Sequence, residues 1–147
     1  MRLYHSIVIM FIGSFIIQYF FMPPIMVSNR TYITNNIGKA YMAIIMALFM
    51  VVLEVMMHDH QYNVFSLYLY GPMVVGIIFF IYLFKNQIGI NDKQYLEEMI
   101  EHHGMGLLTS EEILKKTDNY HITKLAKNII QTQEDEIRVM KELLKRR

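Results

Sequence analysis

The chain has 147 residues, of which 54% are hydrophobic, and its formal net charge is +1 at neutral pH. The near-neutral charge gives no support for nucleic-acid binding, and the absence of cysteine excludes disulfide bonds, thiolate catalysis and zinc sites built from Cys. Charges are few in residues 1–90 and concentrated in residues 91–147. This asymmetry indicates a membrane region followed by a water-soluble segment.

Three nearly continuous apolar stretches predict three membrane-spanning helices, over residues 3–22, 40–57 and 64–84. A helix of about 20 residues crosses a hydrocarbon layer of about 30 Å. We expect the first span to end at Pro23-Pro24, and Pro72 to kink or loosen the third. An uncleaved span is favoured over a secretory signal because only Arg2 marks a basic start and no small-residue cleavage site follows. A polar connection over residues 25–39 follows the first span.

The positions of Lys and Arg near the spans predict the orientation in the membrane. One side has Arg2 alone, whereas the other side has Arg30, Lys39, Lys85 and Lys93. The positive-inside rule then places the N-terminus outside and the C-terminal segment in the cytoplasm.

The charged C-terminal segment predicts an antiparallel helical hairpin. Asn91 or Asp92 can cap its first helix, which should run to about Lys116. The second helix should run from about Tyr120 to Leu144. Two helices of this length bury little by themselves, so we expect a bundle completed by oligomerisation or by docking on the spans. The predicted fold is all-α.

Each helix of the hairpin carries one apolar stripe at helical spacing. The first stripe consists of Leu96, Met99, Ile100, His103, Leu107, Ser110 and Leu114, and the second of Ile122, Leu125, Ala126, Ile129, Gln133, Ile137, Met140 and Leu144. In an antiparallel pair His103 falls level with about Gln133, so the polar interruptions of the two stripes meet. Gly104 and Gly106 each cost a helix about 1 kcal/mol against alanine, which suggests a site or a close helix crossing.

The first candidate metal site takes its side chains from both helices of the hairpin. Its members are Met99, His102, His103, Met105, Gln133, Glu136 and Met140. Imidazole and thioether together favour copper, above all Cu(I), over hard cations. The Glu-to-His spacing of di-iron bundles matches poorly, because Glu98 stands four residues before His102, and no HExxH zinc motif is present. A histidine satisfied by core neighbours stays an equal alternative.

The second candidate site lies in the middle span. Met46, Met50, Glu54 and His58 recur every fourth residue and so share one helix face. Ionisable residues inside a membrane are costly, which makes Glu54 a functional candidate. This face suits passage or sensing of a soft cation, and the alternative is a packing stripe that reaches the headgroups at His58-Asp59-His60.

Two stretches of the C-terminal segment carry a family resemblance. The first stretch is Met99-Ile100-Glu101-His102-His103 followed by Leu107-Leu108-Thr109-Ser110-Glu111. The second is the later run 125–140 with its Ile-Ile pair, Gln, Glu-Ile and Met. Both resemble domain-of-unknown-function family 305. The resemblance covers about residues 92–145. It implies a ferritin-like helical bundle linked to metal binding or tolerance, mainly of copper, through Met and His, and no enzymatic activity is established for the family. The apolar spans resemble the subgroup in which this domain follows a membrane anchor.

The chain departs from the family pattern at two positions. The family often has proline where Glu101 stands, and Gln or Ser where Gly104 stands. Many soluble members also carry two hairpins, so the one hairpin here favours a dimer.

We therefore expect a non-catalytic, membrane-anchored protein that binds a metal, most directly a copper ion. Its expected partners are the lipid bilayer, the metal ion, and a second copy or other membrane subunits. No nucleophile, cofactor motif or activated base indicates an enzyme. Two alternatives stay open, namely a transport component for a soft cation and a structural or assembly subunit without metal.

Overall fold

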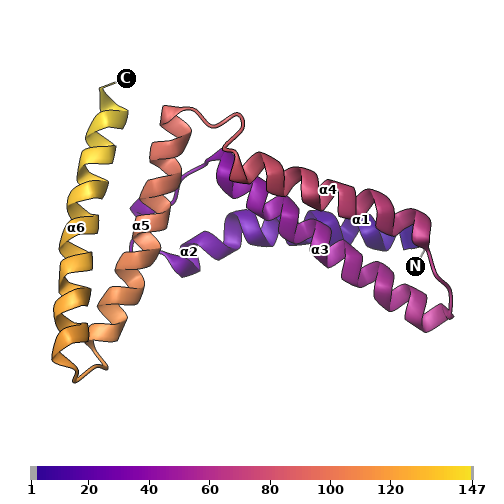
Figure 1. Ribbon diagram of the computed structural model, residues 1–147, viewed down its shortest axis with the longest axis horizontal. Coiled ribbons are helices and arrows are strands. Elements are labelled where there is room, and N and C mark those ends of the chain that lie inside the picture. The colour runs from indigo at the N-terminus through magenta and orange to yellow at the C-terminus, as the bar shows by residue number, and fades with distance from the viewer. Residues whose placement is uncertain (1–2, 147) are drawn as a thin grey trace. The chain divides into compact units, whose positions relative to one another are not determined.

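The computed structural model describes residues 3–146, which are all-helical and contain no strand (Figure 1). Arg2, on which the predicted orientation depends, lies outside the described residues. The elements are α1 (Leu3–Ile16), the π-helical turn η1 (Ile17–Phe21), α2 (Met22–Met26), the 3₁₀ turn η2 (Arg30–Tyr32), α3 (Ile37–Tyr62), α4 (Leu67–Lys85), α5 (Asp92–Leu114) and α6 (Tyr120–Lys145). They form two compact units, one with α1, η1, α3 and α4, the other with α2, η2, α5 and α6.

Three helical stretches are long and apolar enough to cross a membrane. They are Leu3–Met26, Ile37–Tyr62 and Leu67–Lys85. In the most apolar window of the first and of the third stretch, only 6% of the residues are buried. Most of their apolar surface is therefore left without a cover from the chain itself.

The first stretch does not end at Pro23-Pro24, so that prediction is wrong. The helix continues through α2 to Met26. A proline inside a helix clashes with the carbonyl four residues earlier, and for these two prolines the carbonyls belong to Tyr19 and Phe20. Both lie in the π-helical turn η1, whose wider hydrogen-bonding pattern gives those carbonyls room.

The α1–α3–α4 unit packs around Val51 and Val55 of α3 and Met73 of α4, with apolar side chains of α1 against them. Asp59 organises the connection from α3 to α4. Its carboxylate accepts the backbone N–H of Ser66 at 2.7 Å and the Ser66 hydroxyl at 2.8 Å. α3 is longer than the predicted span 40–57, because it begins at Ile37 and ends at Tyr62. Asp59 thus belongs to the last turn of this helix and not to the connection after it.

α5 and α6 lie side by side (Figure 1). They pack through one core cluster, made by Ile100 and Leu107 of α5 and Ile137 and Met140 of α6. The predicted cap at the start of α5 is confirmed, because the Asn91 side chain accepts the backbone N–H of Gln94 at 3.0 Å. α5 ends at Leu114, slightly before the predicted end.

The predicted stripe of α6 is only partly buried. Ala126, Ile137 and Met140 are buried, whereas Ile122 and Leu125 are 43% and 60% exposed. The face that contacts α5 is therefore rotated relative to the predicted stripe. It leaves a second apolar face of α6 exposed beside it.

The segment 28–34 packs on α5, although the sequence pattern predicted only a polar connection there. The Ser28 N–H donates to the Gly104 carbonyl at 3.1 Å, and the Thr34 N–H donates to Glu101 Oε2 at 2.9 Å. The Thr34 hydroxyl donates to the Glu97 carbonyl at 2.7 Å. Residues 22–36 thus belong to the same compact unit as α5 and α6, whereas the distribution of charges predicted that they are part of the membrane region.

Candidate metal centre

His103 is held between the two helices of the α5–α6 pair. Its side chain is 12% exposed, and its Nε2 lies 2.7 Å from Oε2 of Glu136 on α6. On the other side of the ring, Nδ1 lies 2.8 Å from the Met99 carbonyl oxygen. Because a carbonyl only accepts hydrogen bonds, Nδ1 carries a hydrogen, and Nε2 is the atom turned toward the carboxylate.

The two contacts of the His103 ring indicate that a proton lies between His103 and Glu136. A neutral imidazole with its hydrogen on Nδ1 presents a lone pair at Nε2, and an ionised carboxylate presents only lone pairs. A contact of 2.7 Å between the two atoms therefore needs a proton between them. A metal cation can replace this proton, with Nε2 and Oε2 as its ligands, once the two atoms move apart to admit bonds of about 2 Å each. The backbone carbonyl would then orient the ring from behind.

Gln133 lies one helical turn from Glu136 and packs on Gly106 of α5. A Cβ added at Gly106 would lie 3.0 Å from Cδ of Gln133. Oε1 of Gln133 is buried and has no hydrogen-bond partner in the described part of the chain. The structure therefore adds an unpaired polar oxygen to the same contact between α5 and α6.

The other predicted members of the first site have different surroundings. Met140 is buried in the core cluster, and Met99 packs against the same cluster. His102 is exposed, with its ring centroid 6.3 Å from that of His103, and Met105 is half-buried. Within residues 3–146 no group of three or more His, Cys, Asp or Glu side chains is close enough to hold a metal ion. Among the His, Asp and Glu side chains of these residues, the candidate site therefore rests on the His103–Glu136 pair.

The members of the second candidate site also have different surroundings. Met46 and Met50 are 43% and 36% exposed on α3. Glu54 accepts a hydrogen bond from the Ser6 hydroxyl of α1, and His58 Nδ1 lies 3.3 Å from its neighbour Asp59. Glu54 thus has a partner within the packed helices, while the two methionines face outward.

The comparisons with known proteins support the C-terminal resemblance. The family model described as "Domain of unknown function (DUF305)" matches residues 85–146. The chain is also 30% identical over 141 residues to "Uncharacterized protein L153" of Acanthamoeba polyphaga mimivirus, which covers 96% of this chain and 92% of that protein. The chain belongs to the DUF305 family. No solved structure matches it.

The two positions at which the chain departs from the expected DUF305 pattern both contact the segment 28–34. Glu101 is 4% exposed and accepts the Thr34 N–H. A Cβ added at Gly104 would lie 3.0 Å from Cβ and Cδ2 of Tyr32, so glycine is what lets Tyr32 lie against α5. The apolar stripe of α5 gave no sign of this second buried face, and these two departures were its only signal in the sequence.

Two glutamates on α5 add unpaired oxygen atoms near its start. Oε2 of Glu97 and Oε2 of Glu98 are buried without a hydrogen-bond partner in the described residues. Burial raises the pKa of Glu98, the negative charge of Glu101 raises it further, and the attraction of His102 opposes the shift. The sequence pattern did not predict the burial of Glu98, which entered only as part of a poorly matching di-iron spacing.

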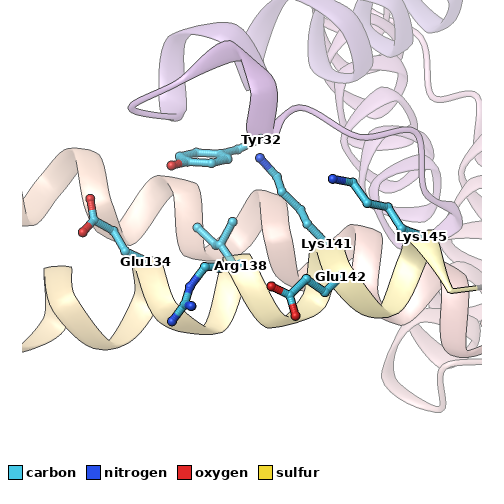
Figure 2. Close-up of a pocket in the computed structure, with 7 residues that line it drawn as sticks. Tyr32, Glu134, Arg138, Lys141, Glu142 and Lys145 are labelled. Atoms are coloured by element: carbon cyan, nitrogen blue, oxygen red, sulfur yellow. The ribbon is translucent and has the colours of Figure 1, made fainter.

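A pocket of about 310 Å³ lies between Tyr32 and α6 (Figure 2). Figure 2 shows charged side chains of both signs around it, from Glu134 and Arg138 to Glu142 and Lys145. The Lys141 ammonium lies 4.5 Å from the centroid of the Tyr32 ring, a cation–π contact. None of the described residues that line this pocket is His or Met, so the lining differs from the predicted metal site of this DUF305 protein.

Proposed function

We propose that this DUF305 protein is a membrane-anchored, non-catalytic metal-binding protein, and that its α5–α6 hairpin binds a copper ion through His103 and Glu136. One observation supports this most directly. Nδ1 of His103 donates to a backbone carbonyl, which leaves Nε2 aimed at a carboxylate oxygen 2.7 Å away. Histidines that bind metals are commonly oriented in this way by a hydrogen bond from the other ring nitrogen.

The donors present favour one oxidation state of copper. Imidazole nitrogen suits copper, and a carboxylate adds a hard oxygen ligand that suits Cu(II) better than Cu(I). The two atoms that the structure brings together are an imidazole nitrogen and a carboxylate oxygen, whereas the thioethers of Met99 and Met140 pack with the apolar core. We therefore propose Cu(II), in place of the Cu(I) that the sequence pattern favoured.

Membrane anchoring rests on the three apolar helical stretches. Much of their surface is exposed and apolar, and a groove of about 360 Å³ among α1, α3 and α4 is lined only by apolar side chains, among them Ile7, Phe11 and Met73. Lipid tails would cover this surface at a gain of roughly 25 cal/mol for each Å² removed from water. The distribution of Lys and Arg supports an outside N-terminus and a cytoplasmic hairpin.

A copper titration of the full-length protein in detergent tests the proposal. We expect His103→Gln to lower the Cu²⁺ affinity at least ten-fold, because it removes the nitrogen ligand. His121→Gln is the matched control, since His121 is an exposed histidine at the start of α6. Equal affinities of the two variants, or no binding by the unaltered protein, would overturn the proposal and favour a structural subunit in which His103 and Glu136 form only an ion pair.

The outward-facing Met46 and Met50, and the bond between Ser6 and Glu54, give less support to a transport component for a soft cation. Uptake of Cu⁺ by vesicles that contain the purified protein distinguishes transport from simple binding. We expect no uptake above that of empty vesicles.

A further inference from the structure

One face of α6 carries an exposed apolar seam that the contact with α5 leaves open. The residues alternate at spacings of four and three: Leu125, Ile129, Thr132, Glu136, Val139 and Leu143. Leu125, Val139 and Leu143 are 60%, 51% and 45% exposed. Alternation of three and four residues is the heptad pattern of helices that pair with another helix. We call these six residues the α6 seam.

Apolar and polar residues follow one another along the α6 seam in an arrangement that is complementary to a second copy of the seam. Its two ends are apolar, and Thr132 and Glu136 in the middle are polar. A two-fold axis near these two residues opposes apolar ends with apolar ends and the polar middle with the polar middle, whichever way the helices run. An interface between identical chains needs this kind of self-complementarity.

The polar middle of the α6 seam is also half of the candidate metal centre. Glu136 is a seam residue, its side chain is 54% exposed, and it holds His103 of α5. A second copy would add ligands to the pair, since two His103–Glu136 pairs provide four donors, and no His, Cys, Asp or Glu within residues 3–146 forms a group of three that could hold a metal ion.

We infer that a second copy of this chain covers the α6 seam and that the two His103–Glu136 pairs then form one shared metal site. The shared site rests on the proposed metal binding, whereas the interface rests on the seam alone. Two matched arms of one experiment separate them. Both use the full-length protein in detergent.

The first arm tests the interface by disulfide formation. The chain contains no cysteine, so a single introduced Cys reports only on itself. Thr132→Cys lies in the middle of the seam, and Lys127→Cys is the control on an exposed position of the same helix outside it. With EDTA present and mild oxidation, we expect at least five-fold more covalent dimer from Thr132→Cys than from Lys127→Cys. Equal yields would overturn the inference.

The second arm tests the shared site by Cu²⁺ titration of the protein without introduced cysteine. Saturation at one Cu²⁺ per two chains supports the shared site, and Glu136→Gln should then lower the affinity as His103→Gln does. Saturation at one Cu²⁺ per chain would overturn the shared site. If Thr132→Cys forms dimers and no Cu²⁺ binds, the proposed function fails and the interface stands.

Discussion

Glu101 accepts the backbone N–H of Thr34 at 2.9 Å, although 67 residues separate them in the chain. This bond, together with the Ser28 bond to the Gly104 carbonyl, holds the segment 28–34 on α5. The segment follows the first apolar stretch and belongs to the same compact unit as α5 and α6. α5, which carries His103 of the candidate metal centre, is therefore held by hydrogen bonds to segment 28–34 as well as by the covalent connection before it.

Removal of the Glu101 carboxylate should free the segment 28–34. In Glu101→Ala the part-buried Thr34 N–H loses this acceptor. We expect the free energy that holds segment 28–34 on α5 to fall by about 1–3 kcal/mol. Amide hydrogen exchange of residues 28–34 should become faster, while exchange in the α1–α3–α4 unit stays the same. Glu112→Ala is the control, because Glu112 makes an exposed ion pair with Lys115, and such pairs contribute about 0–1 kcal/mol. Equal exchange in both variants would contradict this role of Glu101.

The two glycines of α5 should respond differently to alanine. Each change gains about 1 kcal/mol of helix propensity. At Gly104 the new Cβ meets Cβ of Tyr32 at 3.0 Å, an atom next to the backbone that cannot turn away, so the segment 28–34 must move. At Gly106 the Cβ meets the end of the Gln133 side chain, which can rotate. Thermal unfolding should therefore show Gly106→Ala to be neutral or stabilising and Gly104→Ala to be less stable than it. The reverse order would refute this explanation of the glycines.

The stability of the α5–α6 pair should depend on pH through Glu98. Because burial raises the pKa of Glu98 in the folded chain, the folded state favours the neutral carboxyl. The contribution of the neutral Glu98 carboxyl to folding stability is therefore fully present below the pKa of an unfolded glutamate, about 4.3. It is lost as the pH rises through the raised pKa of the folded chain. Glu98→Gln should thus slow amide exchange in α5 at pH 7 and have no effect at about pH 4. If Glu98→Gln slowed amide exchange equally at both pH values, the charge of Glu98 would not be the cause of the slower exchange.

Binding of Cu²⁺ should release a proton. The contact between His103 Nε2 and Glu136 Oε2 holds one proton, and a metal that takes its place must displace it. Calorimetric titrations in buffers with different ionisation enthalpies should therefore give different apparent binding enthalpies, and His103→Gln should remove that difference. The same enthalpy in every buffer would contradict displacement of this proton.

Local patterns predicted much of this structure. Helical periodicity and turn residues predicted the all-helical chain, the three apolar stretches and the two C-terminal helices, and Asn91 predicted the start of α5. Periodicity also indicated that His103 lies on the buried face of α5, where the structure has it against Glu136.

Contacts between distant parts of the chain were not predictable in the same way. The binding of segment 28–34 to Glu101 depends on one carboxylate meeting one backbone N–H, which leaves no periodic signal. The helix through Pro23-Pro24 depends on the π-helical turn before it. The rotation that buries Met140 and exposes Leu125 depends on how α6 meets α5, and a broad apolar face on α6 is compatible with several such rotations.

Electron paramagnetic resonance of the full-length protein loaded with Cu²⁺ tests the central claim most directly. Imidazole nitrogen bound to Cu²⁺ produces hyperfine splitting that carboxylate and water ligands do not. We predict this splitting in the unaltered protein and in His121→Gln, and its loss in His103→Gln. A spectrum without nitrogen splitting, or the same nitrogen splitting after His103→Gln, would contradict the assignment of His103 as the copper ligand.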